Sequence, residues 1–160
     1  MTAAAWANFF VAQCGASAAL LGLLFVSVSL NLARILAFPT LPERALLAML
    51  LLLAILVVAS LMLIPSQPIR ANGVESLAAG ALIAAAAGAA KTRARLGGAY
   101  RRYFIGDLAF LAGATAPYFI AGGLLFAGLE AGFYWLAAAI LLSTAKAVSD
   151  AWVLLVEINR

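Results

Sequence analysis

Twenty consecutive residues, Ala45–Ile64, carry no charged side chain, and Ser60 is the only polar residue among them. A helix needs about 20 predominantly apolar residues to cross a bilayer, so this stretch predicts a transmembrane helix. The whole chain agrees: 67% of its 160 residues are hydrophobic and 10% are charged. Soluble domains have roughly 45–50% apolar and about 25% charged residues. The composition therefore excludes an ordinary soluble domain or a disordered chain and predicts an integral membrane protein.

Turn residues and charged residues divide the chain into five apolar segments of similar length. No segment alternates between apolar and polar residues as the strand of a membrane barrel would. The loops are short, so consecutive helices are expected to be antiparallel neighbours. The sequence thus predicts an all-α, polytopic membrane helix bundle, a single transmembrane domain over residues 1–160. Its five spans are expected at about residues 6–32, 45–64, 74–90, 104–127 and 132–156.

Basic residues gather in the loop between the third and fourth segments. Cytoplasmic loops carry an excess of Lys and Arg, so this loop is expected inside, with the N-terminus outside and the C-terminus inside. The same rule explains the net charge of +4 without nucleic acid as a partner. The basic residues are also expected to contact anionic lipids on the cytoplasmic side. They are Lys91, Arg93, Arg95, Arg101 and Arg102.

The first segment has two patterned faces. At 100° per residue, four polar residues fall within a stripe roughly 80° wide. Gly15 and Gly22, followed by Ser29, recur every seventh residue on nearly the opposite face. Small residues let helices approach closely, and polar side chains bond across helices, so we expect a central helix with neighbours on both sides. The stripe either packs against neighbouring helices or lines a polar path or a subunit interface. It consists of Gln13, Ser17, Ser27 and Asn31.

Three ionisable residues fall inside the last two segments. Lys146 and Asp150 lie four residues apart on one face, which Ser143 shares, and Asp107 is expected at a comparable depth. An intramembrane charge is expensive unless it is paired or hydrated. The cluster is therefore either a structural ion pair or part of an ion or proton path. Tyr118 lies deep in the fourth segment and needs a partner for its hydroxyl.

The third and fourth segments carry further signals. Gly80, Ala84 and Gly88 recur at four-residue spacing, a small-residue face that favours a close helix neighbour. Glu75 is expected in the first turn of the third span, where a carboxylate favours the helix dipole. Pro117 removes one backbone hydrogen bond and is expected to kink the fourth helix.

Signatures of catalysis are absent from the sequence. The chain has no histidine, which excludes a Ser–His site and a histidine-ligated metal. Cys14 is the single cysteine, so no intrachain disulfide can form. No phosphate-binding glycine loop precedes a Lys-Ser/Thr pair. The sequence therefore predicts a protein that is not an enzyme and that binds no cofactor or metal.

Both ends of the chain resemble one group of proteins. The first helix, Asn8–Leu32, and the C-terminal stretches Phe133–Trp135 and Asp150–Arg160 are similar to a group of small, largely uncharacterised bacterial plasma-membrane proteins. Leu41–Ala45 and Pro65–Pro68 fit the same group. Some of its members are labelled modulators of the membrane-anchored AAA protease. The resemblance implies a multi-pass protein of the bacterial plasma (inner) membrane and carries over no catalytic residue.

Two functions remain open from the sequence. The first is a non-catalytic helix-packing accessory, assembly or modulator subunit, bound to other membrane helices of its own kind or of another protein. It explains the small-residue faces and the short loops. The alternative is a homo-oligomeric channel or small transporter, its polar path lined by the first span and the inner half of the fifth.

Overall fold

The computed structural model describes residues 3–38, 41–93 and 101–158, with side chains over residues 5–38, 41–89 and 108–156. Within these ranges the chain is helical and contains no strand. Five helices are long and apolar enough to cross a membrane, as the sequence predicts. The elements are η1 (Ala3–Trp6), α1 (Ala7–Leu30), α2 (Leu32–Ala37), α3 (Leu41–Leu61), α4 (Ile69–Arg93), α5 (Arg101–Phe126) and α6 (Gly132–Ile158).

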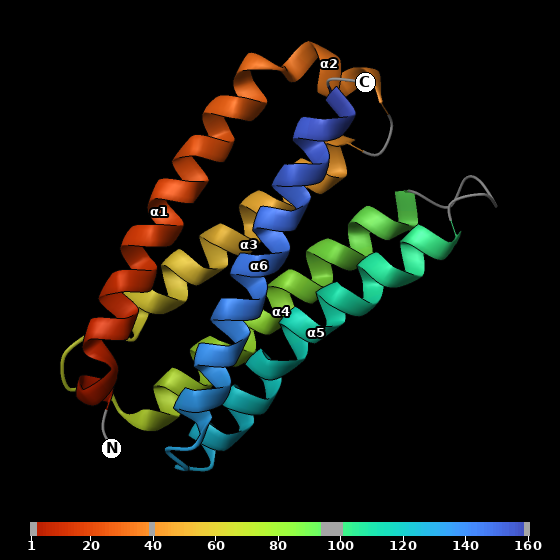
Figure 1. Ribbon diagram of the computed structural model, residues 1–160. Coiled ribbons are helices and arrows are strands. Elements are labelled where there is room, and N and C mark those ends of the chain that lie inside the picture. The colour runs from red at the N-terminus through yellow and green to blue at the C-terminus, as the bar shows by residue number, and fades with distance from the viewer. Residues whose placement is uncertain (1–2, 39–40, 94–100, 159–160) are drawn as a thin grey trace.

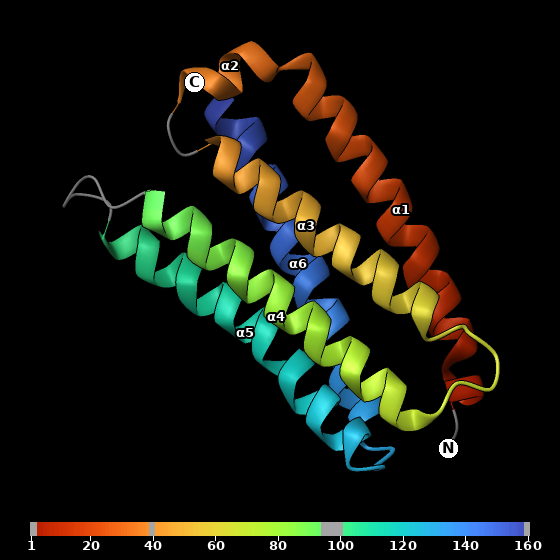
Figure 2. The same cartoon turned by 180° about the vertical axis from the view of Figure 1, so that it is seen from behind.

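The long helices run along one another in a bundle, and consecutive ones are antiparallel (Figures 1 and 2). Helices α3 and α6 occupy the centre, with α1 on one side and the α4–α5 pair on the other. One end of the bundle holds η1, the α3–α4 loop and the α5–α6 turn. The other end holds α2, the end of α4, the start of α5 and the end of α6. Each apolar helix forms its backbone hydrogen bonds within itself, as hydrocarbon surroundings require, apart from the bond that Pro117 cannot make inside α5.

Two spans begin earlier than expected, in each case beside a proline. Helix α3 starts at Leu41 rather than Ala45, with Pro42 in its first turn. Helix α4 starts at Ile69 rather than Val74, because the Pro68 carbonyl accepts the backbone N–H groups of Ala71 and Asn72. A proline is tolerated at a helix start because its missing N–H would be unbonded there anyway.

Helix α2 is a short element that the sequence reasoning missed. The backbone of Asn31 departs from helical geometry at φ −111° and ψ 15°, which ends α1 at Leu30. A second helix then begins at Leu32. The predicted first span therefore ends in a break followed by a one-and-a-half-turn helix, rather than in one straight segment.

Helix α1 lies at the edge of the bundle. The prediction that the first helix is central, with neighbours on both sides, is therefore wrong for a single chain. Only 17% of its apolar stretch is buried, against 50% of that of α3. Its main neighbour is α3. Helix α3 takes the central place because its apolar residues face α1, α4 and α6 together.

Aromatic side chains hold the N-terminal end of α1 against α6. The ring centroids of Trp6 and Tyr134 lie 4.9 Å apart in an edge-to-face arrangement. Trp6 also stacks on Phe133 at 6.3 Å. Further along, α1 and α6 separate around a groove of about 290 Å³ that includes Leu24 and Ala151. Helix α1 therefore contacts α6 at its N-terminal end and is separated from α6 along its second half.

Glycines set the close packing on the other side of the bundle. A Cβ at Gly73 of α4 would lie 2.5 Å from the backbone nitrogen of Phe126 in α5, and one at Gly122 would lie 2.9 Å from the Gly73 carbonyl oxygen. A Cβ at Gly132, the first residue of α6, would lie 2.8 Å from the Ala121 carbonyl oxygen. These positions admit no side chain, and they bring α4, α5 and α6 together at one end of the membrane-spanning region.

Candidate functional site

The structure confirms a buried ion pair in the last helix. One turn of α6 separates Lys146 from Asp150, and both residues are 3% exposed. The Lys146 Nζ donates to Asp150 Oδ1 at 2.5 Å and to Oδ2 at 2.6 Å. Residues four positions apart are neighbours on the surface of a helix, so the sequence spacing alone brings the two charged groups together. The bidentate contact compensates part of the cost of removing both charges from water.

Helix α5 contributes an aromatic ring to this pair. The Lys146 Nζ lies 5.9 Å from the centroid of the Phe110 ring, within range of a cation–π interaction. The backbone of Asp107 lies in α5, three residues before Phe110. Its side chain lies outside the described side chains, so the predicted three-residue cluster is described only for Lys146 and Asp150.

Two buried hydroxyl groups lie next along the α5–α6 interface. Tyr118 of α5 and Ser143 of α6 are both 0% exposed. Their hydroxyls face one another, yet neither makes a hydrogen bond of ordinary geometry within the described part of the chain. Ser143 is therefore the neighbour of the Tyr118 hydroxyl, although the two groups are not in ordinary hydrogen-bond geometry. Ser143 precedes Lys146 by one turn, so the hydroxyls and the ion pair form one polar strip along α6.

The polar stripe of α1 faces into the chain and bonds mostly to its own backbone. Ser17 is 2% exposed, and its hydroxyl donates to the Gln13 carbonyl at 2.7 Å. The Asn31 side-chain nitrogen donates to the Ser27 carbonyl at 3.0 Å. One contact reaches α3, between the thiol of Cys14 and the hydroxyl of Ser60 at 3.3 Å. Local bonding of this kind satisfies polar groups of the stripe without a partner from another helix.

The glycine face of α1 points the other way. Gly15 and Gly22 are exposed, and a Cβ at either would meet nothing within 4 Å. Ser29 is exposed as well, and its hydroxyl donates to the Phe25 carbonyl at 2.8 Å. Among the described residues, Gly15 and Gly22 therefore contact no other helix.

A second polar cluster, at the start of α4, was missed by the sequence reasoning. The Gln67 side-chain nitrogen donates to Glu75 Oε1, so the partner of Glu75 is an amide from the preceding loop. Asn72 is 1% exposed. Three buried oxygens here have no hydrogen-bond partner within the described residues: Gln67 Oε1, Asn72 Oδ1 and Glu75 Oε2. Pro68, after which α4 begins at Ile69, is the sequence signal that would have placed these residues together.

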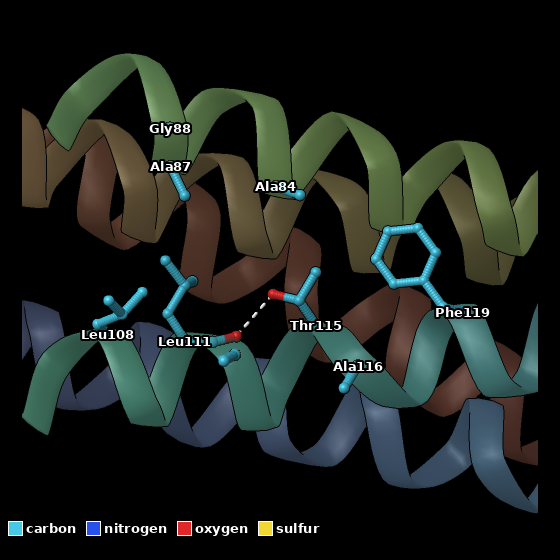
Figure 3. A pocket seen from close by; sticks show the side chains of 9 residues that line it. Ala84, Ala87, Gly88, Leu108, Leu111, Thr115, Ala116 and Phe119 are labelled. Atoms are coloured by element: carbon cyan, nitrogen blue, oxygen red, sulfur yellow. Dashed lines mark hydrogen bonds between the residues drawn. The ribbon is translucent and has the colours of Figure 1, made fainter. Parts of the chain in front are cut away.

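The small-residue face of α4 meets α5 over only part of its length. Gly80 contacts α5 closely, since a Cβ there would lie 3.1 Å from the Tyr118 Cβ. Beyond this point the helices part, and Ala84 and Gly88 border a groove (Figure 3). Helix α4 then ends with Lys91 and Arg93, and α5 begins with Arg101 and Arg102. The side chains of these four residues, and the whole of Arg95, lie outside the described part.

The arrangement of donor atoms limits the chemistry. Among the described residues, no group of three or more Asp, Glu, His or Cys residues could hold a metal ion. The charged groups of α6 can neutralise one another, and the two hydroxyls beside them can bind a water or a passing polar group. No family model, curated protein or solved structure matches the chain.

Proposed function

We propose that this protein is a non-catalytic helix-packing subunit of a membrane complex, acting as an accessory, assembly factor or modulator. The observation that carries the proposal is the uncovered glycine face of α1, with Gly15 and Gly22 at its centre. This face lies opposite the side of α1 that packs on α3. It is available to a helix from outside the chain.

A comparison among the glycines supports this assignment. Gly73, Gly80, Gly122 and Gly132 each lie against another part of the same chain. In contrast, Gly15 and Gly22, seven residues apart on one face of α1, have no such contact among the described residues. Gly88, Gly113 and Gly123 of α4 and α5 are open as well. A glycine inside a helix costs about 1 kcal/mol relative to alanine. Close approach of an external helix would compensate that cost, because small residues allow backbone contact between membrane helices.

We place the protein in the bacterial plasma membrane with its N-terminus outside and its C-terminus inside. The basic residues around the α4–α5 connection support this orientation through the positive-inside rule. Variants with a single introduced cysteine, made in a Cys14→Ala background, test this orientation in intact cells. An impermeant thiol reagent should label a cysteine that replaces Gln67 and leave one that replaces Arg95 unlabelled. The reverse pattern would overturn the orientation.

The packing proposal is tested by the composition of the purified particle. A particle that contains a second membrane polypeptide in fixed stoichiometry is expected. Gly15→Leu and Gly22→Leu should release that polypeptide, because a leucine pushes the neighbouring backbone away. Ala81→Leu, at an exposed position of α4, is the matched control and should keep the complex intact. A complex that survives both glycine substitutions contradicts the proposal.

The second candidate is a homo-oligomeric channel or small transporter. The buried pair of Lys146 and Asp150 favours it, together with the unbonded hydroxyls of Tyr118 and Ser143. Buried charges in membrane segments often mark ion or proton paths. A closed ring of identical subunits, with ion flux in proteoliposomes that Lys146→Met changes, would favour this function over the first.

A further inference from the structure

An open groove lies between the second half of α4 and the first half of α5 (Figure 3). The two helices touch at Gly73 and Gly80 and then separate, and a Cβ at Gly88 would meet nothing within 4 Å. The resulting cavity has a volume of about 400 Å³. Small side chains on both walls create it, chiefly Ala84, Ala87 and Ala112, and Phe119 stands at its inner end.

The groove is apolar along its length. Thr115 is the only residue with a polar side chain among those that line it, and its hydroxyl donates to the Leu111 carbonyl at 2.6 Å. Figure 3 shows that bond directed along α5. That hydroxyl is the only side-chain polar group available in the groove to orient a hydrophilic ligand, and the rest of the lining suits a hydrocarbon chain.

The length of the groove matches one leaflet of a bilayer. Leu108 and Phe119, the lining residues of α5 that lie furthest apart, are separated by 11 residues, which is about 16 Å of helix at 1.5 Å per residue. Half of the roughly 30 Å hydrocarbon core is about 15 Å. The groove therefore runs from the middle of the membrane towards one surface.

Basic residues form the helix ends at the surface end of the groove. The backbones of Lys91 and Arg93 form the end of α4, and those of Arg101 and Arg102 form the beginning of α5. These helix ends flank the groove where it reaches the membrane surface. Phosphate groups of lipids lie at that level, and basic residues there attract anionic headgroups.

We propose that this groove binds an anionic phospholipid, with one acyl chain between α4 and α5 and the phosphate at the basic helix ends. The apolar lining, the length of about one leaflet and the basic residues at one end together match an acyl chain attached to an anionic headgroup. The site lies on the opposite side of the bundle from α1 and is independent of the proposed function.

The test measures the unfolding temperature of the full chain in detergent with added phosphatidylglycerol or with phosphatidylcholine of the same acyl chains. A ligand that binds the folded state raises this temperature. Phosphatidylglycerol should raise it more than phosphatidylcholine. The double variant Ala84→Leu with Ala112→Leu fills both walls and should weaken phosphatidylglycerol binding at least tenfold.

Matched controls separate the groove from general hydrophobicity. Ala85→Leu with Ala109→Leu places the same bulk on exposed positions of the same helices that do not line the groove, and should bind normally. Arg101→Gln with Arg102→Gln should remove the preference for phosphatidylglycerol. Native mass spectrometry of the folded fraction counts bound lipids for any variant of low stability.

Three results would overturn the lipid site. The first is undiminished phosphatidylglycerol binding after the groove is filled. The second is equal stabilisation by both lipids in the unmodified protein. The third is a filled-groove variant that keeps its lipid but loses a second polypeptide, which would make the groove a contact for a partner protein.

Discussion

The two sides of the bundle use small residues in opposite ways. On the α4–α5–α6 side, Gly73, Gly122 and Gly132 lie within contact of neighbouring backbone. On the α1 side, Gly15 and Gly22 face away from the chain. Small residues in a membrane helix indicate a close contact without saying whether the neighbour belongs to the same molecule. The difference teaches that α4, α5 and α6 meet closely at one end of the bundle, while the glycine face of α1 has no neighbour among the described residues.

The largest expected effect is the loss of one charge on the tightly packed side. Lys146→Met leaves the Asp150 carboxylate buried without its partner on α6, which should cost about 3 kcal/mol. Lys146→Met with Asp150→Asn should recover part of that loss, because no carboxylate remains at position 150. The measurement is the free energy of unfolding in mild detergent. Equal stability of the single and double variants would mean that the groups are separately hydrated, and the channel function would then be favoured.

The second prediction compares a glycine from each side. Gly73→Leu should destabilise the isolated chain by about 1–3 kcal/mol, since even a Cβ would overlap the Phe126 backbone. Gly22→Leu should change the stability of the isolated chain by less than about 0.5 kcal/mol, as is usual for an exposed position. Thermal unfolding of the two variants in the same detergent measures both. Similar losses would show that the two sides do not differ as described.

The third prediction concerns the unbonded hydroxyl of Tyr118. Tyr118→Phe removes a buried polar group that lacks a hydrogen bond, so the protein should become more stable by about 1 kcal/mol. Ser143→Ala should act in the same direction. Chemical denaturation resolves a change of this size. A loss of stability in both variants would indicate that a bound water joins the two hydroxyls.

The smallest effect is expected on the α1 side. Ser17→Ala removes hydrogen bonds that the hydroxyl donates to its own helix, to Gln13 and Cys14. Because those carbonyls already bond within the helix and alanine is the better helix former, stability should change by less than about 0.7 kcal/mol. A drop above 2 kcal/mol would show that Ser17 supports a contact with another helix.

Several features followed directly from sequence spacing. The lengths of the apolar segments predicted five membrane helices, and the i,i+4 spacing predicted the contact between Lys146 and Asp150. Helix periodicity also separated the polar stripe of α1, where Ser17 is buried, from the face of Gly15 and Gly22. Each of these inferences depends on geometry within a single helix, which a linear pattern contains.

Other features depend on which helices become neighbours. The sequence reasoning placed α1 at the centre, whereas α3 occupies it, because glycine spacing alone does not reveal what the glycines contact. It also placed Gly73 outside a span and did not pair Gln67 with Glu75, since both depend on the start of α4 at Ile69. The groove beside Ala84 arises where α4 and α5 separate, which neither helix specifies alone.

The sequence by itself determined an all-helical membrane protein, its five spans, its buried ion pair and the faces of its first helix. Hydrocarbon thickness and the 3.6-residue repeat act on each segment separately, so these properties can be read from local composition and spacing. The tertiary structure alone decided the central position of α3, the contact between Gly73 and Gly122, and the groove between α4 and α5. These depend on the fit between surfaces of different helices, because small residues permit several close packings and only the folded bundle selects one.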